Sequence, residues 1–360
     1  MAHLSPVVSA AVESPRYFVR AADMDRDQGD VLRLCRISKL NGSPEKCPWK
    51  YDMNPLGRTW CALAIESASD KVVGTTALFP RRLLVDGTSL RAAVAGDFAV
   101  EPGHRTLYPA IALQKAALAA CQGGAFDVLY GLPNNAARPV QLRAGYQSVG
   151  QVTAGVRLLR TRAALARRGQ ASWRWGADVL DSIVTLLSRE SRANMATSYC
   201  YVSLPRFDAR FDRFWANALA NHRIIVGRDS LYANWRFADC PILKYSLFTA
   251  VHKTTGEIGG YVVWSSSQHG KIRISDLMAY DHAFDGLLTA FIKLQRDQSA
   301  DCITIVYFGN NNLVRKLRRF GFMFRRTPSE VLLSVKPGVP APERFFDSDN
   351  WYLLDGDSDS

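Results

Sequence analysis

The 360-residue chain has no long uninterrupted apolar run, although 48% of its residues are hydrophobic. No stretch of about 18 apolar residues occurs, so no transmembrane helix is expected. Residues 1–15 lack a basic segment followed by an apolar core, which disfavours a signal peptide. We interpret them as a disordered leader.

Cysteine and histidine lack the spacing of metal sites. The seven cysteines are an odd number without a C-x-x-C pair, and the six histidines form no H-x-x-x-H pair. Scattered thiols of this kind argue against a disulfide framework and for a reducing compartment. The sequence therefore predicts no metal and a cytoplasmic location.

The formal net charge is +12. A basic balance suits nucleic acid, an anionic membrane surface or an anionic small ligand. No nucleic-acid-binding motif and no aromatic platform pattern is present, which disfavours nucleic acid. An anionic ligand fits the basic charge as well, and the arginine cluster at 157–174 is best interpreted as a solvated helix face.

Residues 96–114 are the most informative segment. They predict a buried strand that ends at Val100, a turn at Pro102-Gly103 and a helix that opens near Pro109. A strand that leads into a helix N-terminus presents free backbone N–H groups and the positive end of the helix dipole. Arg105 adds a fixed positive charge suited to phosphate. The segment predicts an anion site.

The surrounding pattern predicts a mixed α/β sheet. We expect strands at 17–22, 60–67, 71–85, 88–100 and 126–130, and helices at 28–38, 109–121 and 135–144. Asp86-Gly87 is the favoured two-residue turn of a hairpin. Another strand should follow Gly145, so helices lie on the faces of one sheet.

These residues resemble the acyl-CoA loop of the GNAT acyltransferase superfamily, in which a strand ending in Val leads to R/Q-x-x-G-x-G/A at a helix start. Val100, Pro102, Arg105 and Ala110 match that pattern, whereas Tyr108 stands where the family has its first Gly. Gly131 to Asn135 and Arg143 to Tyr146 resemble the family's later segment. The resemblance covers residues 16–155.

The resemblance implies an N-acyltransferase that moves an acyl group, acetyl in the first instance, from acyl-CoA to an amine. The implied cofactor-binding residues are Phe98, Ala99, Val100, Arg105, Thr106, Leu107, Tyr108, Ala110 and Asn134. Asn134 could equally be a turn or cap residue. Backbone N–H groups near residues 99–101 would stabilise the oxyanion.

Acyl transfer to an alkyl amine benefits from a base, because only about one molecule in 2,500 is neutral at pH 7. Asp97 is the first candidate, with a structural carboxylate as the equal alternative. Glu101 is the second candidate. The family's Tyr acid is replaced by Gln141.

The organisation then repeats. Trp49, Asp97 and Gly145 correspond in order to Trp235, Asp276 and Gly321, with separations of 186 (235 − 49), 179 (276 − 97) and 176 (321 − 145). Motifs that recur in one order indicate two copies of a domain. The repeated tryptophans are expected to be core anchors.

We therefore expect two tandem GNAT-like domains, of which the second, without the loop, is degenerate and binds no CoA. The expected boundaries are a leader at 1–15, the first domain at 16–155, a helical linker at 156–205, the second domain at 206–336 and an acidic tail at 337–360.

Two other hypotheses stay open. A non-catalytic acyl-CoA-binding or assembly protein on a degenerate tandem fold is favoured by Tyr108 and Gln141. An aminoacyl or peptidoglycan transferase would also use paired domains and would bind charged tRNA. The sequence does not identify the acceptor.

Overall fold

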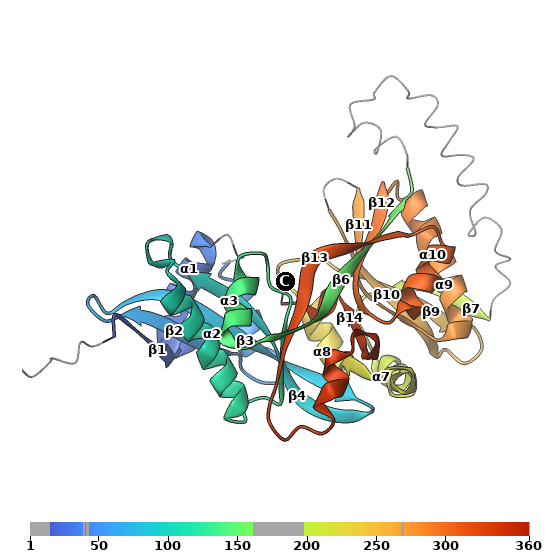
Figure 1. Ribbon diagram of the computed structural model, residues 1–360. Helices are drawn as coiled ribbons and strands as arrows, with labels where there is room; N and C mark the ends of the chain where they lie inside the picture. Colours follow the sequence, from blue (N-terminus) through green and yellow to red (C-terminus); the bar gives the residue numbers. More distant parts are fainter. Residues whose placement is uncertain (1–14, 39, 41–42, 161–197, 268–269, 360) are drawn as a thin grey trace, which may run out of the picture.

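Two halves with the same order of elements share one sheet in the computed structural model, which describes residues 15–38, 40, 43–160, 198–267 and 270–359 (Figure 1). The first half contains β1 (Tyr17–Ala21), α1 (Met24–Ile37), a π-helix (Pro48–Asp52), β2 (Trp60–Glu66), β3 (Lys71–Val85), β4 (Thr88–Val100), α2 (Leu107–Gln122), β5 (Val128–Gly131), α3 (Ala137–Ala144) and β6 (Gln147–Leu158). This is the predicted order.

The second half contains β7 (Tyr199–Leu204), α7 (Ala209–Ala218), β8 (Ile224–Val226), α8 (Ser230–Ala233), a π-helix (Asn234–Ala238), β9 (Ser246–His252), β10 (Ile258–Ser266), β11 (Lys271–Ala279), α9 (Asp281–Asp297), β12 (Cys302–Gly309), α10 (Asn311–Arg319) and β13 (Met323–Val335). β14 (Trp351–Leu354) follows. Apart from β8 and α8, the elements repeat those of the first half.

The last strands of the two halves are exchanged. The sheet order is β1-β2-β3-β4-β5-β13-β6-β12-β11-β10-β9-β7. β5 therefore pairs with β13 from the second half, and β12 pairs with β6 from the first. Figure 1 shows β6 and β13 side by side between the halves. This exchange makes the two halves one continuous structure.

Strand β4 follows the predicted hairpin turn but is interrupted near its end. Asp86 and Gly87 both have positive φ, as a two-residue hairpin turn requires. Further along, Asp97 and Phe98 together lie opposite one residue of β3, and Asp97 has a φ of 43°. This β-bulge breaks the strand alternation. The direction of the Asp97 side chain therefore does not follow from strand alternation.

Helix starts differ from the predictions by a few residues. α1 begins at Met24 because the carboxylate of Asp23 caps it by accepting a hydrogen bond from the backbone N–H of Asp25. α2 begins at Leu107, so Pro109 is the third helical residue; its missing N–H still falls among first-turn groups without an intrahelical partner.

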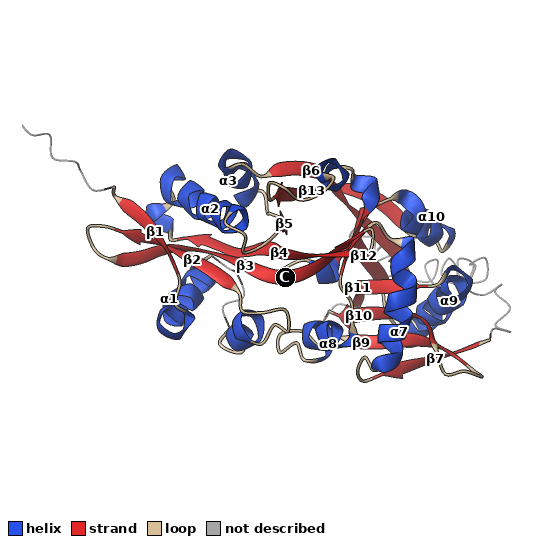
Figure 2. Cartoon of the chain, turned by 90° about the horizontal axis from the view of Figure 1, so that it is seen from below, coloured by secondary structure: helices blue, strands red, loops and turns tan. Residues whose placement is uncertain are grey.

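Helices cover both faces of the sheet, and two tryptophans join the halves. Figure 2 shows α2 and α3 on one face of the first-half strands and α1 on the other. The rings of Trp49 and Trp235 stack 5.1 Å apart. Each indole N–H donates to the backbone carbonyl of the other tryptophan, at 2.8 and 3.0 Å. Both are buried, and they pack against each other.

The predicted helical linker and the predicted acidic tail both contain strands. Residues 156–158 belong to β6 and residues 199–204 to β7, while the rest of the predicted helical linker lies mostly outside the described residues. The predicted acidic tail is folded, because its apolar run Trp351–Leu354 forms β14 and pairs with β12 and β8. Among the described helices, none is long and apolar enough to cross a membrane.

Candidate active site

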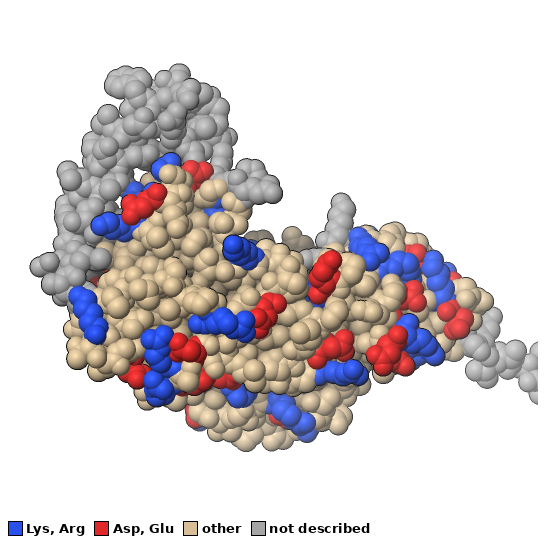
Figure 3. All heavy atoms as spheres, turned by 180° about the vertical axis from the view of Figure 1, so that it is seen from behind, with Lys and Arg blue, Asp and Glu red and all other residues tan. Residues whose placement is uncertain are grey.

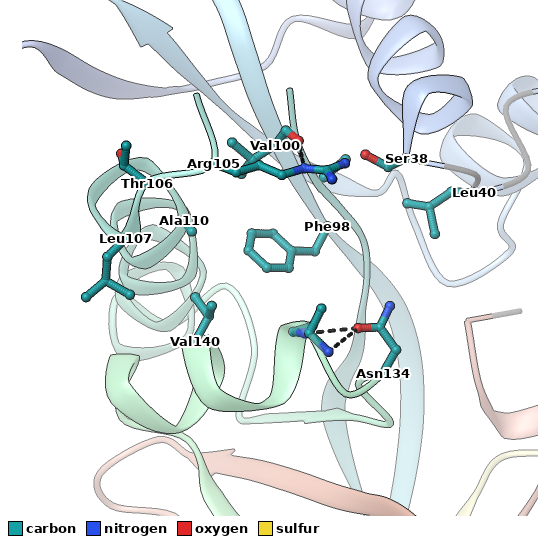
Figure 4. A pocket seen from close by; sticks show the side chains of 13 residues that line it. Ser38, Leu40, Phe98, Val100, Arg105, Thr106, Leu107, Ala110, Asn134 and Val140 are labelled. Carbon is teal, nitrogen blue, oxygen red and sulfur yellow. Dashed lines mark hydrogen bonds between the residues drawn. The ribbon is translucent and has the colours of Figure 1, made fainter. Parts of the chain in front are cut away.

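Strands β4 and β5 diverge at the centre of the first half. Their ladder ends at Val94 and Tyr130, so the end of β4 runs on without pairing to β5. A cavity of about 460 Å³, here called the cofactor pocket, opens there (Figure 4). Its lining is Ser38, Leu40, Phe98, Ala99, Val100, Arg105, Thr106, Leu107, Ala110, Asn134, Ala136, Ala137 and Val140. Eight of the nine predicted cofactor residues are among them.

The loop between β4 and α2 forms one wall of the cofactor pocket. A short 3₁₀ turn at Pro102–His104 leads into α2, whose N-cap residue Thr106 makes no side-chain capping bond. The first-turn N–H groups of α2 therefore stay available to an anion. Arg105 donates from Nε to the carbonyl of Val100 at 3.0 Å, which fixes its guanidinium beside the pocket.

Tyr108 is the predicted cofactor residue that does not line the pocket. Its ring is 56% exposed and stacks on Tyr17 at 6.3 Å. Tyr17 is held in turn by a 3.1 Å hydrogen bond between its hydroxyl and Nδ1 of His104. The side chain at position 108 therefore points away from the pocket and leaves the loop backbone open.

Asn134 forms the turn that precedes α3, one of the alternatives that the sequence left open. Its Oδ1 accepts hydrogen bonds from the N–H groups of Ala136 and Ala137, at 3.0 and 2.9 Å (Figure 4). These contacts fix the start of α3. Because Asn134 also lines the cofactor pocket, only its Nδ2 donor is left for a ligand there.

A second cavity of about 410 Å³, here called the junction pocket, lies between the halves. It shares Leu40, Phe98, Asn134 and Ala137 with the cofactor pocket. First-half residues of β4 and α3 line one side, and residues 236–245 of the second half line the other. The end of β4 therefore separates two connected chambers.

Asp97 lines the junction pocket but is already neutralised. Its Oδ1 lies 3.3 Å from Nζ of Lys46 and 3.2 Å from Nζ of Lys50, and the hydroxyl of Tyr51 donates to its Oδ2 at 3.0 Å. Burial alone would raise the pKa of Asp97, but the two ammonium groups hold that pKa below its ordinary value. A carboxylate in this setting is a weak proton acceptor.

Glu101, the second predicted base, lines neither pocket. Its carboxylate lies 2.9 Å from Nζ of Lys71 and 3.5 Å from Nη1 of Arg33. The hydrogen bond from Lys71 is the main reason why the pKa of Glu101 is lowered. The geometry places Glu101 outside the chambers, as an ion-pair partner near the loop.

A carboxylate from residues 355–359 enters the junction pocket. Asp359 lines the pocket so closely to Gly96 that a Cβ on Gly96 would lie 2.1 Å from its Oδ2. It makes no hydrogen bond or ion pair with any residue that the structure describes. Sequence analysis missed Asp359 because it interpreted residues 337–360 as a tail. The aromatic run at Trp351–Leu354 is the signal that could have indicated a folded segment there.

The chain before Asp359 is held by both halves. The backbone carbonyls of Gly356, Asp357 and Ser358 accept hydrogen bonds from Arg236, Tyr130 and Arg81, respectively. The carboxylate of Asp357 also lies 2.7 Å from Nη2 of Arg228.

Arg228 is buried and lies 3.0 Å from Asp276 as well. Asp276, the counterpart of Asp97 in the repeat, is thereby neutralised by an arginine that also holds residues 355–359.

No cluster of three or more potential metal ligands occurs among the described residues. The groups described at the site are hydrogen-bonded side chains, ion pairs and backbone N–H donors. This arrangement suits recognition of an anionic ligand by the loop and of a polar group by Asp359.

Residues 34–149 match the model of the acetyltransferase (GNAT) domain. A search of curated proteins finds no match. Among solved structures, a probable N-acyltransferase of unknown function from Enterococcus faecalis V583 has a TM-score of 0.63 at 12% identity, over 89% of this chain and 72% of that chain. A GCN5-related N-acetyltransferase from Kribbella flavida gives 0.58 at 17% identity, over 89% and 71%.

N-myristoyltransferase from Saccharomyces cerevisiae, solved with bound myristoyl-CoA, gives a TM-score of 0.56 at 12% identity, over 90% of this chain and 82% of that chain. At these identities the likeness shows the fold. The matched GNAT domain contains the whole strand–loop–helix segment that the sequence singled out. Residues 34–149 therefore match a GNAT acetyltransferase domain, and the chain shares the fold of these solved acyltransferases.

Proposed function

We propose that the protein transfers an acyl group, acetyl in the first instance, from acyl-CoA to an amine. The observation that carries this proposal is the meeting of the cofactor pocket and the junction pocket at Phe98, on the unpaired end of β4. A thioester held in one chamber would face an acceptor in the other. Positioning of this kind can supply about 7–11 kcal/mol of the barrier.

Each group at the site has a role in the proposed step. The amine nitrogen attacks the thioester carbonyl, and backbone N–H groups near residues 98–101 stabilise the oxyanion. Collapse breaks the C–S bond, and the CoA sulfur leaves with the electron pair as a thiolate. The proton lost by the amine goes to the carboxylate of Asp359, the pocket's carboxylate without an ion pair among the described residues.

Asp97 has a different role in this proposal. Its contacts with Lys46, Lys50 and Tyr51 fix the β-bulge and thereby the course of β4 past the thioester. Glu101 fixes the start of the loop through Lys71 and Arg33. Both predicted bases thus become positioning residues.

We also propose that the second half is a degenerate copy that lacks a cofactor loop. Residues 101–106 separate β4 from α2, whereas Tyr280 alone separates β11 from α9. A second domain within 206–336 would then shape the acceptor chamber and hold residues 355–359. All seven cysteines are free, which fits the proposed cytoplasmic location.

Calorimetric titration with acetyl-CoA tests the cofactor part of the proposal. The wild type should bind, and Arg105→Glu should weaken binding at least tenfold. Arg58→Glu is the matched control, because Arg58 is 74% exposed and lies outside both pockets. Absence of binding heat from the wild type, or equal loss in both variants, would refute a cofactor site at this loop.

Amine-dependent release of CoA separates transfer from the alternative of a non-catalytic acyl-CoA-binding protein. That alternative is favoured by the neutralised state of Asp97 and Glu101. It predicts acetyl-CoA binding without release of CoA for every amine tested. A tRNA-dependent transferase would shift charged tRNA in a gel. Figure 3 shows charges of both signs interspersed on the face that it displays, and not the single basic surface that tRNA binding favours.

A further inference from the structure

The junction pocket has mostly apolar walls. Its lining includes apolar residues from both halves: Leu40, Trp49, Phe98, Leu132, Pro133, Ile242 and Leu243. The volume of about 410 Å³ is that of a small-molecule site. Apolar walls of this kind favour a hydrocarbon frame, because transfer of apolar surface from water stabilises the complex.

The junction pocket is lined by two cations and two carboxylates, and a third cation, Lys50, also contacts Asp97 at 3.2 Å. Lys46 and Arg236 are cations, and Asp97 and Asp359 are carboxylates. Lys46 pairs with Asp97 at 3.3 Å, and Nε of Arg236 donates to the carbonyl of Gly356 at 2.9 Å. Asp359 makes no hydrogen bond or ion pair among the described residues and interacts with Lys50 only through the longer-range attraction of their charges, so its oxygens can bind a ligand.

An amide in the lining of the same pocket favours the same kind of ligand group. Gln141 lines the pocket and is 3% exposed, and its Oε1 has no hydrogen-bond partner among the described residues. A buried acceptor without a donor is unfavourable. Asp359 and Gln141 thus both have acceptor oxygens without a donor. An ammonium group offers three N–H donors.

We propose, on the basis of the function proposed above, that the acceptor is a primary monoamine on an apolar frame, of the arylalkylamine or alkylamine class. Its single ammonium group binds Asp359, and its frame lies against the apolar walls. Polyamines and amino sugars fit poorly, because their further ammonium groups would be buried beside Lys46 and Arg236 without a second open carboxylate.

The test is calorimetric binding of amines to the CoA-saturated protein. We expect 2-phenylethylamine and octylamine to bind at least tenfold more tightly than spermidine, kanamycin or L-phenylalanine. The neutral analogue 2-phenylethanol should bind at least tenfold more weakly than 2-phenylethylamine, and Asp359→Asn should remove most of that difference. Tighter binding of spermidine, kanamycin or L-phenylalanine than of 2-phenylethylamine would overturn the proposal.

A second variant tests specificity without loss of the fold. Leu243 is 41% exposed at the pocket, so Leu243→Glu should add a second carboxylate and improve spermidine relative to 2-phenylethylamine at least tenfold. Leu231→Glu is the matched control, since Leu231 is 67% exposed and outside the pocket. Equal effects of both variants would contradict the proposed walls.

The ranking depends on binding alone, so it is measured whether or not CoA is released. Absence of acyl transfer with the expected ranking would refute the proposed function and leave the acceptor class supported. Transfer to spermidine in preference to 2-phenylethylamine would refute the acceptor class and leave the proposed function supported.

Discussion

Replacing Arg228 by Met should destabilise the protein strongly and disturb residues 355–359. The guanidinium is buried and contacts Asp276 at 3.0 Å, Asp357 at 2.7 Å and the carbonyl of Val226 at 2.7 Å. Its removal leaves two buried carboxylates without their cation. Breaking a buried pair in this way costs about 3–5 kcal/mol.

That cost can be expressed as a melting temperature. An unfolding entropy of roughly 2.1 cal/mol/K per residue gives about 0.76 kcal/mol/K for 360 residues. Arg228→Met should therefore lower the melting temperature by about 4–7 °C in a calorimetric scan. Arg206→Met is the matched control, because Arg206 pairs with Asp239 at 2.6 Å with a side chain that is 54% exposed. An exposed pair contributes about 0–1 kcal/mol, so the control should lose under about 1.5 °C.

Two further measurements separate the loss of the Arg228 contacts from a general loss of stability. The double variant Arg228→Met/Asp357→Asn should recover part of the loss, because the amide removes one orphaned charge. Acetyl-CoA affinity should stay within about threefold of the wild type, since the residues that line the cofactor pocket all lie between Ser38 and Val140. A fall no larger than that of the control, or no recovery in the double variant, would refute the argument.

Three other predictions follow from named contacts. Gly96→Ala should reduce kcat roughly 10²–10⁴-fold, about as much as Asp359→Asn, because the new Cβ displaces the carboxylate of Asp359. Acetyl-CoA binding should be retained, and an unchanged kcat would contradict this prediction. Burial lowers the pKa of His222 to about 4, so the native state takes up this proton later than the unfolded chain as pH falls. As pH falls from about 6.5 to 4, the free energy of unfolding should decrease by on the order of 3 kcal/mol. In melting scans, His222→Gln should show a smaller decrease of melting temperature over this pH range. An equal pH dependence in wild type and variant would count against the prediction. Calorimetry should give one acetyl-CoA per chain, and a stoichiometry near two would show a second cofactor site.

The fold of the first half was predictable because its signals are local. The Asp86-Gly87 turn predicts the hairpin of β3 and β4, and both strands have the predicted bounds. The loop residues are contiguous, so eight of the nine predicted cofactor residues meet in one cavity. The direction of Tyr108 depends instead on Tyr17, a residue of another strand, which no local pattern reveals.

The acceptor side was not predictable for the same physical reason. The junction pocket is assembled from α3, the segment before β9 and residues 355–359, which are distant in sequence. The exchange of β6 and β13 is equally invisible, because either strand has the pattern to pair in either half. Identifying Asp359 requires knowledge that Arg81, Tyr130 and Arg236 hold the preceding carbonyls.

The repeat of Asp97 by Asp276 explains why the sequence alone could not assign a base. Both carboxylates are buried, and each is neutralised by cations and accepts a hydrogen bond from a tyrosine, Tyr51 or Tyr261. What they share is therefore a structural role beside an irregularity of the sheet. The difference lies in the cations: Lys46 and Lys50 end on Asp97, whereas Arg228 continues to Asp357. In the second half, Arg228 thus connects Asp276 to the segment that carries Asp359, and this segment lines the junction pocket.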